Sequence, residues 1–279
     1  MNSFPTTLTT MRRASCVAGI VAVCIMVGPA SAQDCEAEPA WLVPPDTPYL
    51  EIADSPWLAE EGWGYFWLDN FEMGYVMTPG LTMSADPGYV RAPGTFTDSV
   101  DGDDGVIDGS GAEGHSYHAM YTDTGGVWLL IEFDPEYLEV LPTHVGFVWT
   151  DGLEGAELIV EVFDLERTPM DARSVHFGNA AYTGSTAEDR FIGVSHPDGI
   201  AGVRLTTTDG GLEIDHVQYG FMPECPSDTN GDRRIDMVDL LTVLSAWGPC
   251  ECCPADLDGD QSVGFTDLLE VLSAWGACS

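Results

Sequence analysis

The chain has 279 residues, of which 44% are hydrophobic and 20% charged, a globular composition that excludes disorder along its whole length. It carries 46 Asp and Glu against 9 basic residues, and its formal net charge is −37. So negative a protein repels phosphate backbones and anionic lipid, which excludes nucleic acid and membrane surfaces as expected partners. This balance suits cations or neutral ligands such as glycans.

Residues 1–32 have the pattern of a secretory signal peptide. Arg12 and Arg13 precede the apolar stretch 14–28, and the small residues 30–32 form a cleavage site. The apolar stretch, about 15 residues, is shorter than the roughly 20 residues that span a bilayer. We therefore expect a secreted or cell-surface protein with no membrane span in the mature chain.

Residues 33–222 are predicted to form one β domain. The chain contains 31 Gly and 18 Pro, which favours a turn-rich fold, and short apolar or alternating runs recur between turn residues. Since no segment shows a convincing helical period, we predict a mainly β fold, an antiparallel β-sandwich of jelly-roll type. The predicted strands are 65–71, 127–133, 144–149, 158–163, 190–194, 201–206 and 212–219.

The loop from Asp98 to Gly111 is dense in acid and glycine. Oxygen donors at this density can hold a structural Ca²⁺, so a calcium ion here is one expectation. A solvated acidic turn is the alternative, and the sequence favours that alternative slightly.

The sequence indicates no catalytic residue. It contains no nucleophile elbow, zinc-protease helix, phosphate-binding loop or dinucleotide fingerprint. His115 and His118 could share a metal, although a polar surface role is favoured for them. Three histidines in or near the predicted strands are expected to be structural: His144, His176 and His216.

Four tryptophans of the β domain are candidates for stacking on sugar rings: Trp63, Trp67, Trp128 and Trp149. Tryptophans on strands more often belong to the core. The acids are so numerous that a pair suited to glycoside hydrolysis remains an open alternative, because the separation of such a pair depends on the fold.

The last part of the chain, residues 223–279, contains a duplication with a period of 28 residues. The run Leu244 to Gly248 recurs as Leu272 to Gly276, and oxygen-bearing side chains open each copy at every second position. Alternate side chains of one loop can surround a hard cation with six or seven oxygens, which is the requirement of Ca²⁺. The candidate ligands are Asp228, Asn230, Asp232, Asp236 and Asp239 in the first loop, and Asp256, Asp258, Asp260 and Asp267 in the second.

A short amphipathic helix is predicted after each loop. Leu240, Leu244 and Trp247 form an apolar stripe that Leu268, Leu272 and Trp275 repeat. Neither helix can bury its stripe alone, so we expect the two copies to pack as a pseudo-twofold pair.

The duplicated loop and helix resemble a dockerin, the small calcium-binding module that attaches proteins to cohesin domains. This resemblance covers about residues 225–279 and implies that the nine ligands above bind two calcium ions. It also implies a cohesin-like or cell-surface protein as the partner. Two departures are notable: Arg233 and Gln261 stand where the sixth loop position often has Gly, and Gly264 offers no side-chain ligand at the ninth.

Six cysteines remain after residue 32: Cys35, Cys225, Cys250, Cys252, Cys253 and Cys278. In an exported protein such clustering indicates disulfides that staple a small module. Of the 15 possible pairings, the repeat register favours one bridge per copy, Cys225 with Cys250 and Cys253 with Cys278.

Three functions are consistent with these patterns. The first is a non-catalytic secreted protein whose sandwich binds an extracellular ligand, with carbohydrate as a candidate, and whose dockerin-like tail binds calcium and docks to a partner. The second is a dockerin-bearing polysaccharide hydrolase. The third is a structural component of the cell surface stabilised by its calcium ions.

Overall fold

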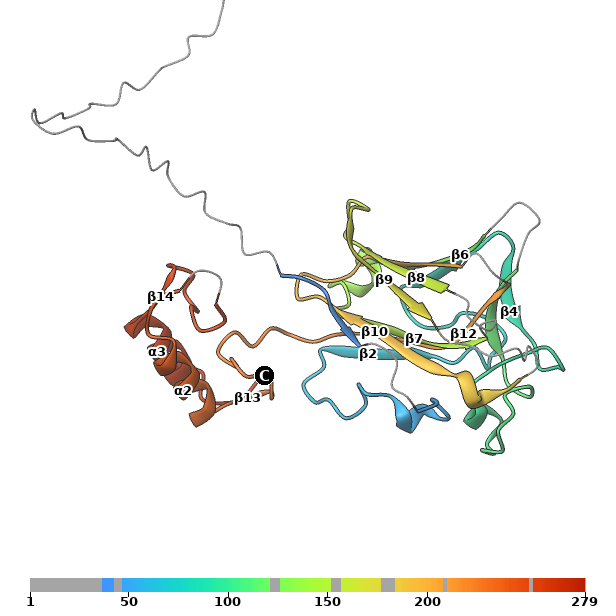
Figure 1. Cartoon of the computed structure of the whole chain (residues 1–279), viewed down its shortest axis with the longest axis horizontal. Coiled ribbons are helices and arrows are strands. Elements are labelled where there is room, and N and C mark those ends of the chain that lie inside the picture. The colour runs from blue at the N-terminus through green and yellow to red at the C-terminus, as the bar shows by residue number, and fades with distance from the viewer. Residues whose placement is uncertain are drawn as a thin grey trace, which may run out of the picture. The chain divides into compact units, whose positions relative to one another are not determined.

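The structure, a computed structural model, describes residues 37–42, 47–120, 126–151, 157–176, 184–207, 210–250 and 253–278. Two antiparallel sheets form its larger part, and Figure 1 shows β6, β8 and β9 in one layer and β2, β7, β10 and β12 in the other. The first sheet contains β1 (Ala40–Leu42), β10 (Arg190–Ser195), β7 (His144–Asp151), β12 (Leu212–Phe221), β5 (Ser116–Ala119) and β4 (Gly88–Arg91) in this order, with β2 (Tyr65–Asp69) paired to β12. The second contains β3 (Leu81–Ser84), β6 (Val127–Phe133), β11 (Gly202–Thr207), β8 (Glu157–Phe163) and β9 (Pro169–His176).

The strand order is that of a jelly roll. From β5 onward the chain pairs as a nested hairpin: β8 with β9, β7 with β10, β6 with β11 and β5 with β12, all antiparallel. Successive pairs alternate between the two sheets, which is how a jelly roll folds a long hairpin into a sandwich. The predicted antiparallel, jelly-roll sandwich is therefore confirmed.

The core lies between the two sheets. Along β6 the side chains alternate, and Leu129 and Ile131 are fully buried in one core cluster with Phe147 and Tyr219 of the opposite sheet. Burial of each such side chain contributes about 1.5–3 kcal/mol. The alternate positions of β6 are more exposed, which leaves an outer face available for a ligand.

All seven predicted strands are present, each with bounds within two residues of the prediction. Strands β1, β3, β4, β5 and β9 were not predicted. Three 3₁₀ turns, Ile52–Asp54, Asp101–Asp104 and Thr186–Glu188, and the short helix α1 (Pro135–Leu138) complete this part of the chain.

The predicted signal segment, Cys35 and Cys252 lie outside the described residues. Within the described ranges, no helix has the length and apolar character needed to traverse a bilayer. The strands of the two large sheets end at Phe221 and the elements of the repeat begin at Arg234, so the proposed division near residue 222 stays a prediction.

The C-terminal repeat folds as two interlocked copies. Helices α2 (Met237–Ser245) and α3 (Phe265–Ser273) pack on each other. The small strand β13 (Arg234–Ile235) of the first copy pairs with β16 (Gly276–Ala277) of the second, and β14 (Gly248–Pro249) of the first pairs with β15 (Ser262–Val263) of the second. The pairing is reciprocal, which confirms the expected pseudo-twofold arrangement.

The disulfides differ from the predicted ones. The bridges are Cys225–Cys278 and Cys250–Cys253, with Cα–Cα distances of 5.8 and 5.9 Å. The pairing of Cys225 with Cys250 and of Cys253 with Cys278 is therefore wrong. The pseudo-twofold axis is the reason, because it brings the cysteine that opens each copy to the cysteine that closes the other.

The buried face of each helix also differs from the predicted stripe. Val243 and Val271 are fully buried, and Leu240 and Leu268 pack partly buried beside them. The remaining positions of the predicted stripe are exposed: Leu244, Trp247, Leu272 and Trp275. The helices are short and both tryptophans lie beyond the helix ends, so the helical period does not carry them onto the contact face.

Candidate functional site

The two acidic loops of the repeat have the same backbone. The fourth position of each loop, Gly231 and Gly259, has a positive φ, and so does the sixth, where Arg233 has φ 65° and Gln261 has φ 70°. Non-glycine residues adopt this conformation only with some strain. The loops therefore keep the turn for which the sixth position often has Gly, although neither copy has Gly there.

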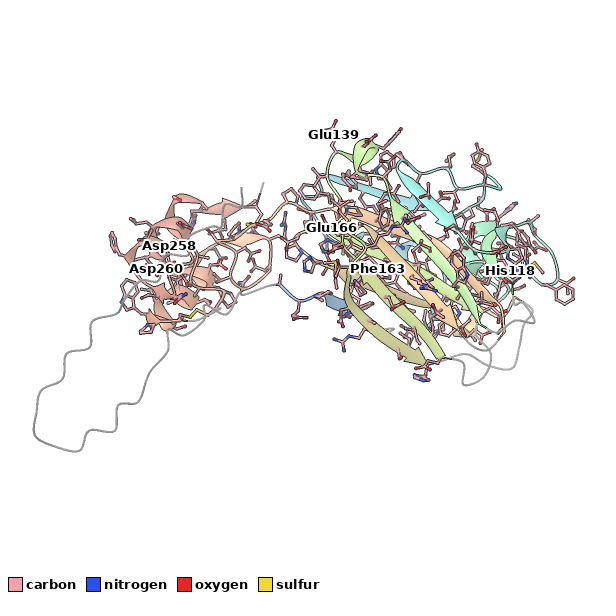
Figure 2. The ribbon with its side chains drawn as sticks, turned by 90° about the horizontal axis from the view of Figure 1, so that it is seen from above. His118, Glu139, Phe163, Glu166, Asp258 and Asp260 are labelled. Carbon is pink, nitrogen blue, oxygen red and sulfur yellow. A yellow bond between two sulfur atoms is a disulfide. The ribbon has the colours of Figure 1, made fainter. Side chains whose placement is uncertain are left out.

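In each loop the backbone wraps around the carboxylate of the first acid, which accepts hydrogen bonds from N–H groups later in the loop. Asp228 accepts hydrogen bonds from the backbone N–H groups of Gly231, Asp232 and Arg233 at 2.6–3.1 Å. Asp256 does the same for Asp260 and Gln261 at 3.1 and 2.8 Å. Figure 2 labels Asp258 and Asp260 on the second loop.

The twelfth position closes each loop. Asp239 is 0% exposed and Asp267 is 1% exposed, and the carboxylate of each accepts three backbone N–H groups of its own copy. Burial acts to raise the pKa of both carboxyls, but these hydrogen bonds outweigh it and hold each pKa below its usual range. The donors are Thr229, Asn230 and Asp236 for Asp239, and Leu257, Asp258 and Gly264 for Asp267.

The second loop brings three of its four candidate ligands together. Oxygens of Asp256, Asp258 and Asp267 all lie within 4.8 Å of one another. Asp260 is not in this group. Carboxylates are the hard oxygen donors that Ca²⁺ prefers, so the residues present fit that ion.

The first loop is arranged differently around its candidate ligands. Asn230 and Asp232 hydrogen-bond to each other at 3.1 Å, and Asp236 caps α2 by accepting from Val238 at 2.8 Å. Among the described residues, Asp228 is grouped with the sulfurs of Cys225 and Cys278, but these sulfurs form a disulfide and cannot serve as ligands. The first loop therefore supplies oxygen donors without the three-carboxylate cluster of the second.

Each helix of the repeat exposes apolar side chains at equivalent positions. On α2 and just after it these are Met237, Leu241, Leu244 and Trp247, and on α3 and after it Phe265, Leu269, Leu272 and Trp275. Their exposed fractions run from 45% to 67%. Single exposed apolar residues are ordinary, but two matching groups of this size are characteristic of interaction surfaces.

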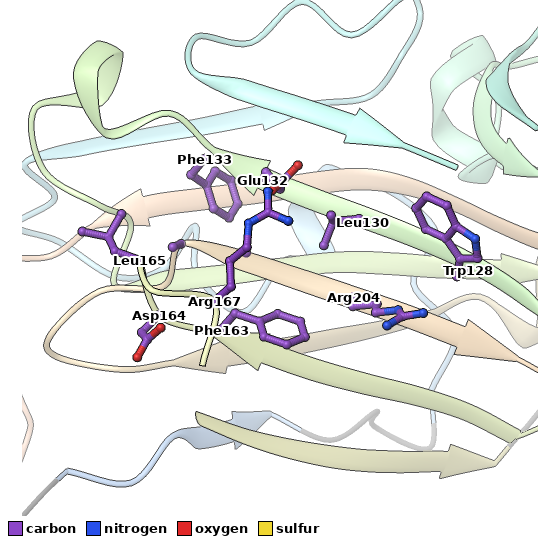
Figure 3. A pocket seen from close by; sticks show the side chains of 11 residues that line it. Trp128, Leu130, Glu132, Phe133, Phe163, Asp164, Leu165, Arg167 and Arg204 are labelled. Atoms are coloured by element: carbon purple, nitrogen blue, oxygen red, sulfur yellow. The ribbon is translucent and has the colours of Figure 1, made fainter. Parts of the chain in front are cut away.

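A hollow of about 480 Å³ lies on the outer face of the second sheet. Trp128 lines one end, Asp164 and Leu165 line the other, and Leu130 and Arg204 lie between them (Figure 3). Leu130 and Arg204 face each other across β6 and β11. Glu132 pairs with Arg167 at the rim. The lining combines apolar surface with charged hydrogen-bonding groups, as ligand sites do.

Of the four candidate tryptophans, Trp128 alone lines this hollow. Trp149 is 1% exposed and belongs to the core, whereas Trp63 is partly buried against Phe66. Trp67 is 40% exposed and is paired through β2 to Tyr219 of β12.

In the part of the chain that the structure describes, His115 and His118 are not brought together as metal ligands, whereas His216 lies in one candidate group with Asp103 and Asp215. His115 contacts Glu72 at 3.3 Å, whereas Nδ1 of His118 accepts from Arg91 at 2.9 Å. His216 is buried, and its two ring nitrogens form hydrogen bonds with the hydroxyl of Tyr49 and the carboxylate of Asp103. These contacts agree with the expected structural role. No group of candidate metal ligands among the described residues contains His115 or His118.

The Asp98 to Gly111 loop is only partly a solvated turn. Asp98 and Asp101 are each 1% exposed, whereas Asp104 and Asp108 are exposed. Asp101 accepts from the backbone of Asp108 and Gly109 at 3.2 and 2.8 Å, so its carboxylate closes the loop. The solvated-turn alternative is wrong for these two buried acids, because the loop folds back on its first half.

Comparison of the sequence with family models and with curated proteins finds no match. Similar solved structures include a bacteriophage CBA120 tailspike protein 4 domain (12% identity, TM-score 0.32). The match covers 55% of this chain and 21% of the tailspike chain. A structure of TmCBM61 in complex with β-1,4-galactotriose has 15% identity and a TM-score of 0.29. The match covers 55% of this chain and 94% of the TmCBM61 chain. A family 11 carbohydrate-binding module from Clostridium thermocellum has 11% identity and a TM-score of 0.27. The match covers 56% of this chain and 94% of the module. At this level of similarity they assign no function.

Proposed function

We propose that this chain is an exported, non-catalytic binding protein with two working parts. The C-terminal repeat binds two calcium ions and docks to a cohesin-like or surface partner, and the sandwich binds carbohydrate. The observation that carries the proposal is the repetition, 28 residues apart, of the loop turns, the closing acid and the exposed apolar positions in the tail.

Calcium would be held by the side chains of Asp256, Asp258 and Asp267 in the second loop. In the first loop the corresponding donors are Asp228, Asn230 and Asp239, with Asp232, Asp236 and Asp260 completing the two sets. A bound ion supplies positive charge that offsets the repulsion among these carboxylates. Because it binds the folded loop, it adds about 2.7 kcal/mol per site at a hundredfold excess over Kd.

Chelation of the whole chain tests the calcium part. EDTA is expected to lower the Tm of the repeat with the disulfides intact, and Asp256→Asn combined with Asp228→Asn is expected to remove most of this response. Asp198→Asn, at an exposed acid far from both loops in sequence, serves as the control. An unchanged transition in EDTA would contradict calcium binding by the loops.

The docking part concerns the two matching apolar groups. Leu241 is 56% exposed and Leu269 is 48% exposed, so neither is needed for the small core. Calorimetry against isolated cohesin modules, with calcium present, is the direct assay. Leu241→Asp with Leu269→Asp is expected to abolish binding without changing calcium stoichiometry, whereas absence of binding by the unmodified chain would sink the cohesin proposal.

The hollow beside Trp128 supports the carbohydrate part. An indole ring can stack on a sugar face while charged groups beside it accept and donate hydrogen bonds to hydroxyls. A glycan array probed with the whole chain should find ligands whose binding falls at least tenfold in Trp128→Ala. Trp67→Ala is the matched control, and equal loss in both variants would place the ligand elsewhere.

A further inference from the structure

Three carboxylates from distant parts of the sequence meet at a buried place beside the loop that follows β4. Asp98 lies in the loop after β4, Asp151 is the last residue of β7, and Glu188 ends the third 3₁₀ turn. One oxygen of each lies within 4.8 Å of the others. Asp98 is 1% exposed and Glu188 is 5% exposed, so this is an interior group rather than a solvated acidic surface.

Two buried acids at this place have no hydrogen-bond partner. Both carboxylate oxygens of Asp98 are buried and unpartnered, and so are both oxygens of Asp189, which is 0% exposed. Buried polar atoms in folded proteins are nearly always paired. Unpartnered carboxylate oxygens beside a converging group of acids therefore indicate a ligand that the protein itself does not supply.

The surrounding charge points to a cation. Glu213, 1% exposed, accepts from the backbone N–H of Asp98 at 3.2 Å and also from the hydroxyl of Ser116. Arg91 lies 3.6 Å from Glu213, and Arg190 donates to the backbone carbonyls of Ala187 and Asp189. Two positive charges therefore stand near five carboxyl groups. Burial, with the charges of Glu213, Asp151 and Glu188, raises the pKa of Asp98 to about 9, which reflects the cost of leaving this group uncompensated.

We propose that Asp98, Asp151 and Glu188 bind one divalent cation of the calcium class in this buried place beside the loop that follows β4. Two oxygens bound to one ion at about 2.4 Å can lie no more than about 4.8 Å apart, and all three pairs meet this limit. The donors are all hard oxygens, as calcium prefers. The ion links the end of β7, the loop after β4 and the segment before β10.

This site differs from the calcium ion expected within the Asp98 to Gly111 loop. Only Asp98 comes from that loop, because Asp101 is not part of the converging group and Asp108 is exposed. It is also separate in sequence from the repeated loops, so its occupancy can be measured independently of them.

Metal analysis of the whole chain after equilibration with calcium tests the proposal. The variant Asp228→Asn with Asp256→Asn, which disables the tail loops, should retain one equivalent of calcium, and adding Asp98→Asn should remove it. Glu188→Gln in place of Asp98→Asn should give the same loss. Asp108→Asn, in the same loop but outside the group, is the matched control and should retain the ion.

These variants separate the failure of this site from failure of the tail proposal. If the tail binds nothing, the unmodified chain and the tail variant both hold one equivalent, and only Asp98→Asn reduces it to zero. If the interior site is absent, the tail variant retains no calcium and Asp98→Asn has the stoichiometry of the unmodified chain. That second result would overturn the proposal.

Thermal unfolding gives a readout that distinguishes a cation site from protonated buried acids. With calcium in excess, Asp98→Asn should have a lower Tm than the unmodified chain, because a ligand is lost. In EDTA at neutral pH the order should reverse, since the substitution removes the cost of burying an acid whose pKa is raised above neutral. An Asp98→Asn variant that is more stable in both conditions would contradict metal binding.

Terbium luminescence places the ion. The indole nitrogen of Trp149 donates to the backbone carbonyl of Asp151 at 2.6 Å, so this ring lies beside the proposed ligand. Tb³⁺ bound to the tail variant should show indole-sensitised emission that calcium displaces and that Trp149→Phe weakens. Sensitised emission that survives Asp98→Asn would mean that the ion lies elsewhere.

Discussion

Aspartate occupies three different physical environments in this chain. The carboxylate of Asp267 is buried but accepts backbone N–H groups, that of the half-buried Asp236 caps a helix, and that of Asp98 is buried with no hydrogen-bond partner. In the sequence all three are acids with both apolar and polar residues close by. The spacing of residues identified the loop acids, but burial depends on distant segments and could not identify Asp98 as an interior ligand.

His118 should make the sandwich sensitive to acid. Burial, together with the Arg91 guanidinium, lowers the pKa of His118 to about 4, against about 6.5 in an unfolded chain. Between these values the folded state binds fewer protons than the unfolded state, so stability falls as pH decreases through this window. Arg91 already donates to Nδ1 of His118. Protonation of Nδ1 would place its N–H group opposite the N–H group of Arg91, and this hydrogen bond would be lost.

The measurement is the Tm of the whole chain between pH 7 and about pH 4, in His118→Gln and in the unmodified protein. The variant should lose Tm less steeply, with a difference of a few degrees. His176→Gln, at an exposed histidine, controls for the removal of a histidine as such. Equal slopes for all three proteins would show that His118 protonates without cost.

At the level of elements, the sequence indicated strands with continuous or alternating apolar runs, such as β7 and β8, and missed strands without such a run. In β9 only Val175 is buried, because this edge strand covers little of the core. Strand β5 has the opposite problem: Ser116 is buried and polar, since it donates to Glu213 of β12. Such short or polar strands carry no period, and the neighbouring strands determine their structure.

The two disulfides join equivalent places but enclose loops of very different length. Cys225–Cys278 has a sequence separation of 53 and Cys250–Cys253 a separation of 3. Because a bridge restricts the unfolded chain more when its loop is longer, removal of the first should cost about 4 kcal/mol and removal of the second about 2 kcal/mol.

Denaturant unfolding of the paired serine variants, Cys225→Ser with Cys278→Ser and Cys250→Ser with Cys253→Ser, measures both losses. Pairing the substitutions leaves no unpaired thiol from either bridge. A larger loss in the second variant would mean that the native contacts of the short bridge, rather than loop closure, govern its contribution.

For the whole molecule, the pseudo-twofold symmetry of the tail explains both what the sequence could predict and what it could not. The period of 28 residues predicted two similar loops and helices that pack on each other. It did not predict that β13 and β14 of the first copy pair with β16 and β15 of the second. The disulfide prediction failed because the bridges likewise join one copy to the other. A repeat shows what its copies share, whereas their contacts depend on the axis that relates them.

The net charge of the whole chain has a measurable effect on its thermal stability. At −37 the folded protein repels itself, and ion pairs such as Arg173–Asp171, more than half-exposed at the arginine, contribute little against this. Raising NaCl from about 0.05 to 0.5 M shortens the screening length, so in EDTA the Tm should rise by a few degrees.

Choline chloride should reproduce the rise, since screening depends on ionic strength and not on the identity of the cation. Calcium should reduce the salt effect, because ions bound at the acidic sites already neutralise part of the charge. A Tm that falls with salt would show that attractive pairs outweigh the repulsion. A rise with NaCl but not with choline chloride would instead indicate weak binding of sodium by the carboxylates.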